Sequence, residues 1–137
     1  MKIAFKSIII SLLVLSFASP VKAQNTLVLV NNTRHKIKAS FVYYDNSCGC
    51  FVSRGWRTIH KYESNTINLD ELGITNRTMY VHGEHGFRNW GRTLPFSMHR
   101  SGHPMRYADH WHRNHFRKMF TELTLKDGQN TFTFTHR

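Results

Sequence analysis

Hydrophobic and polar positions alternate along this chain over short stretches, with a period of two residues. The clearest stretch is 35–45, where Ile37, Ala39, Phe41 and Tyr43 alternate with Lys36, Lys38, Ser40 and Val42. Such alternation is typical of a strand that buries one face. The other strand-like stretches, short and rich in β-branched and aromatic residues, are 26–31, 50–60, 64–69, 78–84, 121–125 and 131–135. The pattern predicts an all-β fold, a small antiparallel sandwich or barrel of about seven strands.

Two glycines refine this prediction. Gly55 interrupts the stretch 50–60, which predicts a β-bulge or a close approach of another backbone. Asp127 and Gly128 separate the last two stretches, and Asp-Gly supplies the positive φ angles of a tight turn. Residues 121–135 are therefore predicted to form a β-hairpin.

A long segment, 86–118, separates the fifth and sixth predicted strands. It exceeds the roughly 12–15 residues beyond which an unstructured loop is uncommon, which indicates a functional insertion, disorder or an unrecognised element. Six aromatic residues argue against disorder, while glycines and prolines break the segment into pieces. A short helix over about 105–119 is the alternative for its second half.

The N-terminus has the pattern of an export signal. Lys2 and Lys6 precede an apolar stretch at 7–17, and Val21 and Ala23 suit the positions before a cleavage point. The stretch is shorter than the roughly 20 residues that span a bilayer, so cleavage is favoured over an uncleaved anchor. The expected mature chain is a single β-rich domain, 24–137, that is periplasmic or secreted.

Positive charge is concentrated in the segment 86–118. The whole chain carries a net charge of +11, and this segment holds seven basic residues and one acid, Asp109. Such a segment attracts anionic partners over a distance, in a way that added salt weakens. The arginines Arg88, Arg92, Arg113 and Arg117, with Trp90, are the predicted binding residues, because guanidinium groups and ring faces suit phosphate, sulfate and carboxylate groups. The expected partner is an anionic surface, glycan, lipid headgroup or acidic protein, or else nucleic acid; the alternative is a solvated basic face without a partner.

Residues 27–84 resemble a known family. The matching positions include Asn31–Thr33, the pair Gly55 and Trp56 followed by Ile59, and the stretch 79–84. They resemble an exported bacterial family named domain of unknown function 1036. The family places two cysteines where this chain has Val30 and Ser64. The resemblance implies a small β-rich module, assigns no activity, and does not cover 86–118.

Cys48 and Cys50 are the two cysteines of the chain, in the sequence Cys-Gly-Cys. In an oxidising compartment they are expected to form a disulfide with each other. Thiolate metal ligation and a bridge between two chains are the alternatives that the sequence leaves open.

Seven of the ten histidines fall between His82 and His115. The candidate metal ligands are His99, His103, His110, His112 and His115. Imidazole suits zinc and copper(II), and the nearby thioethers of Met98 and Met105 suit copper(I). The chain shows no closed four-ligand spacing of a structural zinc site, so a polar histidine-rich loop is the alternative.

A nuclease-like hydrolase is a further hypothesis, with Glu84 or His85 as general base and Arg88 steadying a phosphate. The sequence contains no recognised nuclease, serine-hydrolase or zinc-protease motif. The leading hypothesis is therefore a non-enzymatic exported module that requires no cofactor, with copper or zinc binding as the second.

Overall fold

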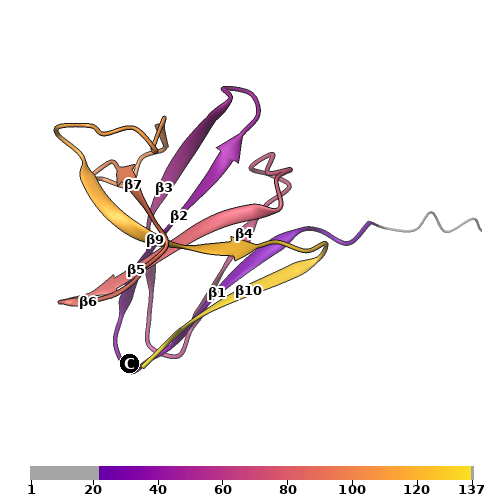
Figure 1. Ribbon diagram of the computed structural model, residues 1–137. Coiled ribbons are helices and arrows are strands. Elements are labelled where there is room, and N and C mark those ends of the chain that lie inside the picture. The colour runs from indigo at the N-terminus through magenta and orange to yellow at the C-terminus, as the bar shows by residue number, and fades with distance from the viewer. Residues whose placement is uncertain (1–21, 137) are drawn as a thin grey trace, which may run out of the picture.

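A computed structural model describes residues 22–136 of the chain (Figure 1). The predicted export signal, 1–23, lies outside the described residues except for its last two positions. The strands, in chain order, are β1 (Thr26–Asn32), β2 (Ile37–Asp45), β3 (Cys50–Ile59), β4 (Ser64–Asn68), β5 (Thr78–His85), β6 (Arg88–Trp90), β7 (Leu94–Met98), β8 (Met105–Arg106), β9 (Phe116–Thr124) and β10 (Gln129–Thr135). The all-β prediction is confirmed, and within 22–136 no helix is long and apolar enough to cross a bilayer.

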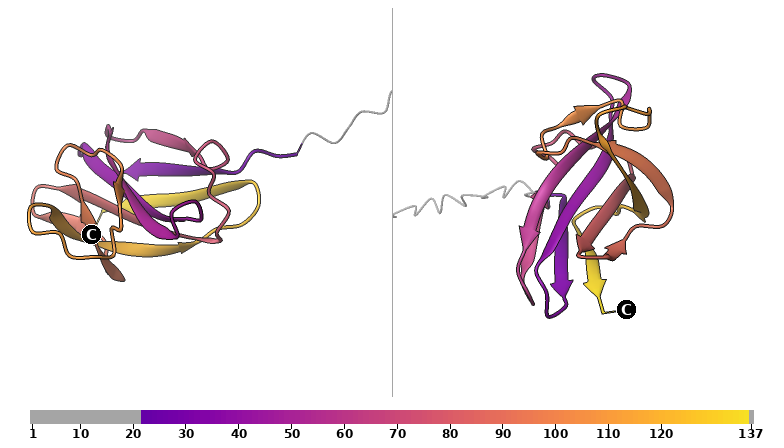
Figure 2. Two further views of the ribbon diagram at one scale, coloured as in Figure 1. Left: turned by 90° about the horizontal axis from the view of Figure 1, so that it is seen from above. Right: turned by 90° about the vertical axis from the view of Figure 1, so that its left-hand side faces the viewer.

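The strands form two sheets. The smaller sheet has the order β10-β1-β4, with β1 parallel to β10 and antiparallel to β4. The larger sheet has the order β7-β9-β5-β2-β3-β8, with β6 paired to β5. Figure 2 shows the larger sheet curling into a half-barrel, with the smaller sheet against one of its faces. The result is a small sandwich with one strongly curved layer.

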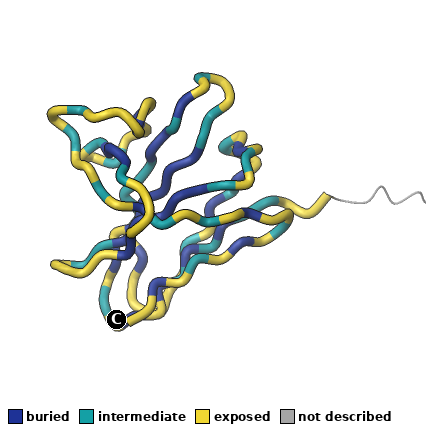
Figure 3. Tube along the Cα trace, viewed as in Figure 1, coloured by how far each residue is buried: buried dark blue, intermediate teal, exposed yellow. Residues whose placement is uncertain are grey.

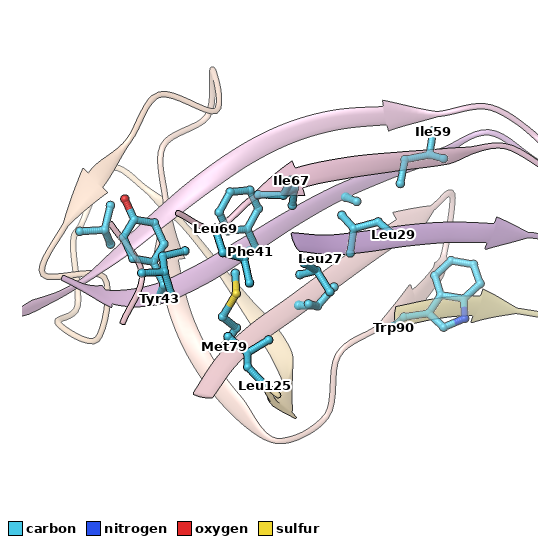
Figure 4. Packing of buried hydrophobic residues seen from close by; sticks show 14 of the residues in the cluster. Leu27, Leu29, Phe41, Tyr43, Ile59, Ile67, Leu69, Met79, Trp90 and Leu125 are labelled. Atoms are coloured by element: carbon cyan, nitrogen blue, oxygen red, sulfur yellow. The ribbon is translucent and has the colours of Figure 1, made fainter. Parts of the chain in front are cut away.

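The larger sheet buries both of its faces. One face packs against the smaller sheet, where Phe41 and Met79 meet Leu27, Leu29 and their neighbours (Figure 4). The other face lines the hollow of the half-barrel and forms a second core around Val42, Tyr80, Phe96, Met98, Ala108 and Phe120. Because side chains alternate between the faces of a strand, Phe41 and Val42 belong to different cores.

The predicted bulge at Gly55 is confirmed. The pairing of β2 with β3 shifts register between Ala39 and Ser40, directly opposite Gly55. A Cβ on Gly55 would lie 2.6 Å from the Cβ of Ser40, and the Gly55 N–H donates to the carbonyl of Gly102 at 3.3 Å. A side chain at this position would therefore collide with β2.

The predicted hairpin over 121–135 is wrong, although both of its strands exist. β9 pairs with β5 and β7 in the larger sheet, whereas β10 pairs with β1 in the smaller one. Gly128 has the expected positive φ of 85°, but its N–H donates to the side chain of Asn25, and its carbonyl accepts from Thr26. The turn is thus fastened to the start of β1, and it carries the chain from one layer to the other.

Segment 86–118 is not an insertion into the fold, and the helix considered for 105–119 does not form. The segment contains β6, β7, β8 and the start of β9, all in the larger sheet. Phe96 and Met98 of β7 are almost completely buried in the second core. Strands of two to five residues are too short to show a repeating pattern of hydrophobic and polar positions. Apart from β8, the 99–115 part consists of connecting loops.

Candidate functional site

The loops over 99–115 close one end of the second core and are fastened to it by backbone hydrogen bonds. Ser97 of β7 donates its N–H to the carbonyl of Ala108 at 2.6 Å and its hydroxyl to the carbonyl of His110 at 2.8 Å. Ala108 is fully buried, and its N–H donates to the carbonyl of Phe51 at 3.0 Å. Most neighbouring side chains remain exposed (Figure 3). The loop therefore holds a set of polar and aromatic side chains in water on an ordered backbone.

These loops and the start of β9 present large rings to solvent. Trp111 is 73% exposed, Tyr107 47% and Phe116 41%. Arg100 lies over the ring of Phe116, with its guanidinium carbon 4.9 Å from the ring centre, and the Lys118 ammonium lies 5.4 Å from the same centre. Such distances are those of cation–π contacts.

Residues 99–118 hold five basic residues and one acid, Asp109, which lies 3.9 Å from the ring of His110. Among the residues that the structure describes, none of the four arginines here makes an ion pair. We give the name 99–118 surface to the exposed arginines and aromatic rings of this region, together with the partly exposed Lys118: Arg100, Arg106, Tyr107, Trp111, Arg113, Phe116, Arg117 and Lys118.

The structure divides the predicted anion-binding set. Arg113 and Arg117 belong to the 99–118 surface, and Arg117 donates to the carbonyl of His110 at 3.4 Å. Arg88, in β6, lies beside the β1–β2 turn, at a different end of the larger sheet (Figure 1). Arg92 is exposed between β6 and β7, without a hydrogen bond or ion pair among the described side chains.

The prediction that Trp90 offers its ring to a ligand is wrong. Trp90 is 6% exposed, donates its ring N–H to the carbonyl of Thr135 at 3.0 Å and packs edge-on against Phe134 at 5.7 Å. It lies opposite Gly83, where a side chain would take the space of Phe134. Trp90 is thus a core residue that packs between the larger sheet and β10 of the smaller sheet.

Four of the five predicted metal ligands form a row. His103 and His99, His99 and His115, and His115 and His112 are edge-to-face pairs with ring centres 5.4–5.5 Å apart. His110 lies outside the row, stacked on Tyr107 at 5.7 Å with nearly parallel planes. Within 22–136, no three histidine, cysteine or carboxylate side chains converge as a metal site requires.

Hydrogen bonds fix some ring nitrogens of the row. Nδ1 of His99 accepts from the N–H of Ser101, so this nitrogen carries no proton. Nε2 of His112 lies 3.1 Å from the carbonyl of Tyr107, so it must donate. Nδ1 of His115 is buried and has no partner among the described residues. A metal on Nε2 of His99 would require the bond from Ser101 to break, because a ligating imidazole normally keeps a proton on its other nitrogen.

A second polar network, absent from the predicted sites, lies inside the half-barrel. Nδ1 of His82 lies 2.7 Å from the carbonyl of Met119, and Nε2 lies 3.1 Å from a carboxylate oxygen of Glu84. The same oxygen is 3.0 Å from the ammonium of Lys118. Burial raises the pKa of Glu84, but the hydrogen bonds from His82 and Lys118 and the charge of Lys118 leave that pKa below its usual value. The sequence contained the relevant pattern, since residues two apart on a strand share a face.

The residues of the nuclease hypothesis are not assembled. Glu84 is bound to His82 and Lys118, whereas His85 projects from the other face of β5 and stacks on His35 at 4.4 Å. Arg88 pairs in the sheet with His85, not with Glu84. A carboxylate bound by Lys118 and His82, with its pKa lowered, is a poor general base, so this arrangement favours a structural role for Glu84.

Cys48 and Cys50 are joined by a disulfide in the β2–β3 turn. Both sulfur atoms are used by this bridge, and Cys50 is almost fully buried. Neither thiolate is therefore available to the histidine row.

Comparisons of the chain with models of protein families, with characterised proteins and with solved structures gave no match. The resemblance of residues 27–84 to domain of unknown function 1036 therefore stays a prediction.

Proposed function

We propose that this chain is an exported binding protein that attaches to a polyanionic glycan through the 99–118 surface. The observation that carries the proposal is the combination of exposed rings with unpaired arginines on a fastened loop. Guanidinium groups bind sulfate or carboxylate groups with two parallel hydrogen bonds, and exposed rings offer flat faces to sugars. Export is inferred from residues 1–23 alone.

The ordered backbone supports binding over mere solvation. Trp111 is 73% exposed, although burying a ring of this size is strongly favourable. The hydrogen bonds from Ser97 hold its loop in place. A ligand that meets a fixed surface loses less conformational entropy than one that must order a mobile segment. The surface is therefore prepared for contact before a partner arrives.

Neutralising Arg113 and Arg117 together is expected to shorten retention on immobilised heparin. The slope of log affinity against log salt concentration should fall by about two, because two anion contacts are removed. The measurement is the salt concentration at elution, followed by binding isotherms at several salt concentrations.

The matched control is R77Q/K126Q, which removes the same charge from the β4–β5 loop and the β9–β10 turn. Arg77 and Asp127 are 3.9 Å apart and largely exposed, so their contact contributes little to stability. Equal losses of retention in both double variants would mean that only the net charge matters, and the proposed surface would be abandoned.

Zinc or copper binding is the second candidate function, favoured by the spacing of the histidine row. Two imidazoles bound to one tetrahedral ion at about 2.0–2.1 Å have their ring centres roughly 5 Å apart with crossed planes. The pair His99 and His115, at 5.5 Å with planes 64° apart, is near this arrangement.

If this pair binds the metal, H99A/H115A should lose one tight equivalent of Zn²⁺ or Cu²⁺ that H110A retains. Binding should weaken below about pH 6.5, where imidazole is protonated. Calorimetric titration of metal-free protein measures both effects. Several weak equivalents that are unchanged in either variant would exclude a site in the row.

A further inference from the structure

A second group of positive charges lies at the end of the molecule where three chain segments meet. These are the β1–β2 turn, the β5–β6 turn and the last described residues (Figure 1). His35 and His85 are stacked there, with ring centres 4.4 Å apart and planes 11° apart. Arg34, Arg88 and His136 surround the stacked pair. A shallow cavity lies beside it, lined by His35, His85, Gly86, Phe87 and Arg88.

Arg34 donates hydrogen bonds to two of these imidazoles. Its backbone N–H donates to Nε2 of His136 at 3.2 Å, and its side-chain Nε–H donates to Nε2 of His35 at 3.4 Å. A ring nitrogen accepts a hydrogen bond only when it carries no proton. Burial, followed by the charges of His85, Arg34, Arg88 and His136, lowers the pKa of His35.

The stacked pair is unsuited to a shared metal ion. The lone pair of an imidazole nitrogen lies in the plane of its ring, so rings in nearly parallel planes direct their lone pairs side by side. A metal ion is therefore not the ligand that this geometry favours.

Among the residues that the structure describes, no acid is free to act as a counter-charge to this cluster. The charged and titratable groups near the pair are Arg34, Arg88 and His136, with Lys36, Lys38 and Glu84 in the adjoining cavity. His60, after β3, is also near, since its carbonyl and that of His35 both accept from the side chain of Asn31. Glu84, the one acid among them, is bound by His82 and Lys118. Neither Arg34 nor Arg88 makes an ion pair with any described residue.

We propose that Arg34 and Arg88 bind a sulfate or phosphate group beside the stacked pair, and that His35 and His85 take up protons from solvent as this anion binds. Two adjacent imidazolium rings between arginines would repel each other, so protonating both rings without an anion is unfavourable. A bound dianion supplies the missing negative charge and stabilises the protonated rings. By linkage, anion binding that is accompanied by proton uptake becomes stronger as the pH falls.

Inorganic sulfate is the sharpest probe, because its charge stays constant over about pH 5 to 8, where histidine titrates. Sulfate affinity, measured by calorimetry, should increase as pH falls by up to about tenfold per pH unit for each proton taken up. The ring resonances of His35, followed by NMR, should titrate at higher pH with sulfate than with chloride.

Two variants and a control locate the site. R88Q should weaken sulfate binding throughout the pH range, and R92Q, which removes the same charge a few residues away, should not. H35N/H85N should bind sulfate with an affinity that no longer depends on pH. Sulfate binding that is independent of pH in the unmodified protein, or equally weakened by R88Q and R92Q, would overturn the proposal.

A vesicle-binding experiment distinguishes a lipid phosphate group from a soluble anion. Phosphatidylcholine vesicles with phosphatidic acid, compared with vesicles without it, test for a phosphate carried by lipid. Pelleting with the acidic vesicles at low pH, lost in R88Q, assigns a lipid phosphate group. Sulfate binding without pelleting assigns a soluble ligand. The R113Q/R117Q variant should keep the sulfate response, so this site and the 99–118 surface fail or succeed separately.

Discussion

Replacing Phe134 with alanine is expected to lower the free energy of unfolding by about 3–5 kcal/mol, the usual cost of deleting a fully buried aromatic side chain. Phe134 is completely buried and lies between the two sheets, against Trp90 at 5.7 Å and Phe132 at 5.0 Å. β10 has no backbone pairing with the described strands of the larger sheet. Side-chain packing such as that of Phe134 against Trp90 therefore holds β10 against that sheet. Urea denaturation of residues 24–137 measures the loss.

Gly83 provides a coupled test of the same packing. A Cβ on Gly83 would lie 2.8 Å from Cδ1 of Phe134 and closer still to Cε1, so Gly83→Ala should destabilise the unmodified protein. The same change in the Phe134→Ala background should cost much less, since the cavity can accept the methyl group. Fully additive costs in this double-mutant cycle would show that the two positions are not in contact.

Glu84→Gln is expected to cost about 1–3 kcal/mol at neutral pH, the usual contribution of hydrogen bonds that involve a charged group. His82 is 2% exposed, and both of its ring nitrogens are within hydrogen-bonding distance of acceptors, one of them Glu84. A glutamine at position 84 carries no charge, so its contacts with His82 and Lys118 are weaker than those of the carboxylate.

The cost of this substitution should depend on pH with a definite sign. The pKa of Glu84 is lower in the folded protein than its usual value, so the carboxylate contributes stability above the unfolded pKa of about 4.3. This stability is lost as the pH falls through the lower folded value. The unfolding free energies of the protein and of E84Q should therefore converge in acid, while E122Q, exposed on β9, should differ little at any pH. A difference between the protein and E84Q that persists unchanged in acid would contradict this role.

Local patterns in the sequence predicted strands but not their partners. The alternation at Ile37, Ala39, Phe41 and Tyr43 correctly predicted one buried face of β2. It missed the second buried face, because Ser40 and Val42 are covered only when the sheet curls and 99–115 closes over it. The partner of β10 could not be predicted either, since its sequence is compatible with pairing to β9 or to β1.

The predicted anion-binding residues lie on different parts of the molecule for a similar reason. Arg88 and Arg113 are close enough in sequence to suggest one surface, but β6 returns along β5 and takes Arg88 to the stacked histidines. The sequence predicted that the histidines of 99–115 lie near one another, and four of them do. It did not show that Trp90 belongs to the core, because a tryptophan in a basic segment looks the same whether it faces solvent or a glycine on the neighbouring strand.

The most direct test of the proposed function is to map binding of a heparin oligosaccharide on isotopically labelled protein by NMR. The titration should be done at about pH 7.5, a unit above the usual imidazole pKa of roughly 6.5, to disfavour anion binding that depends on protonated histidine. The account predicts that backbone resonances of 99–118 and the indole N–H of Trp111 shift together with one affinity, and that this affinity drops in R113Q/R117Q. Shifts centred on Arg34 and Arg88, or weak shifts spread over every basic residue, would contradict it.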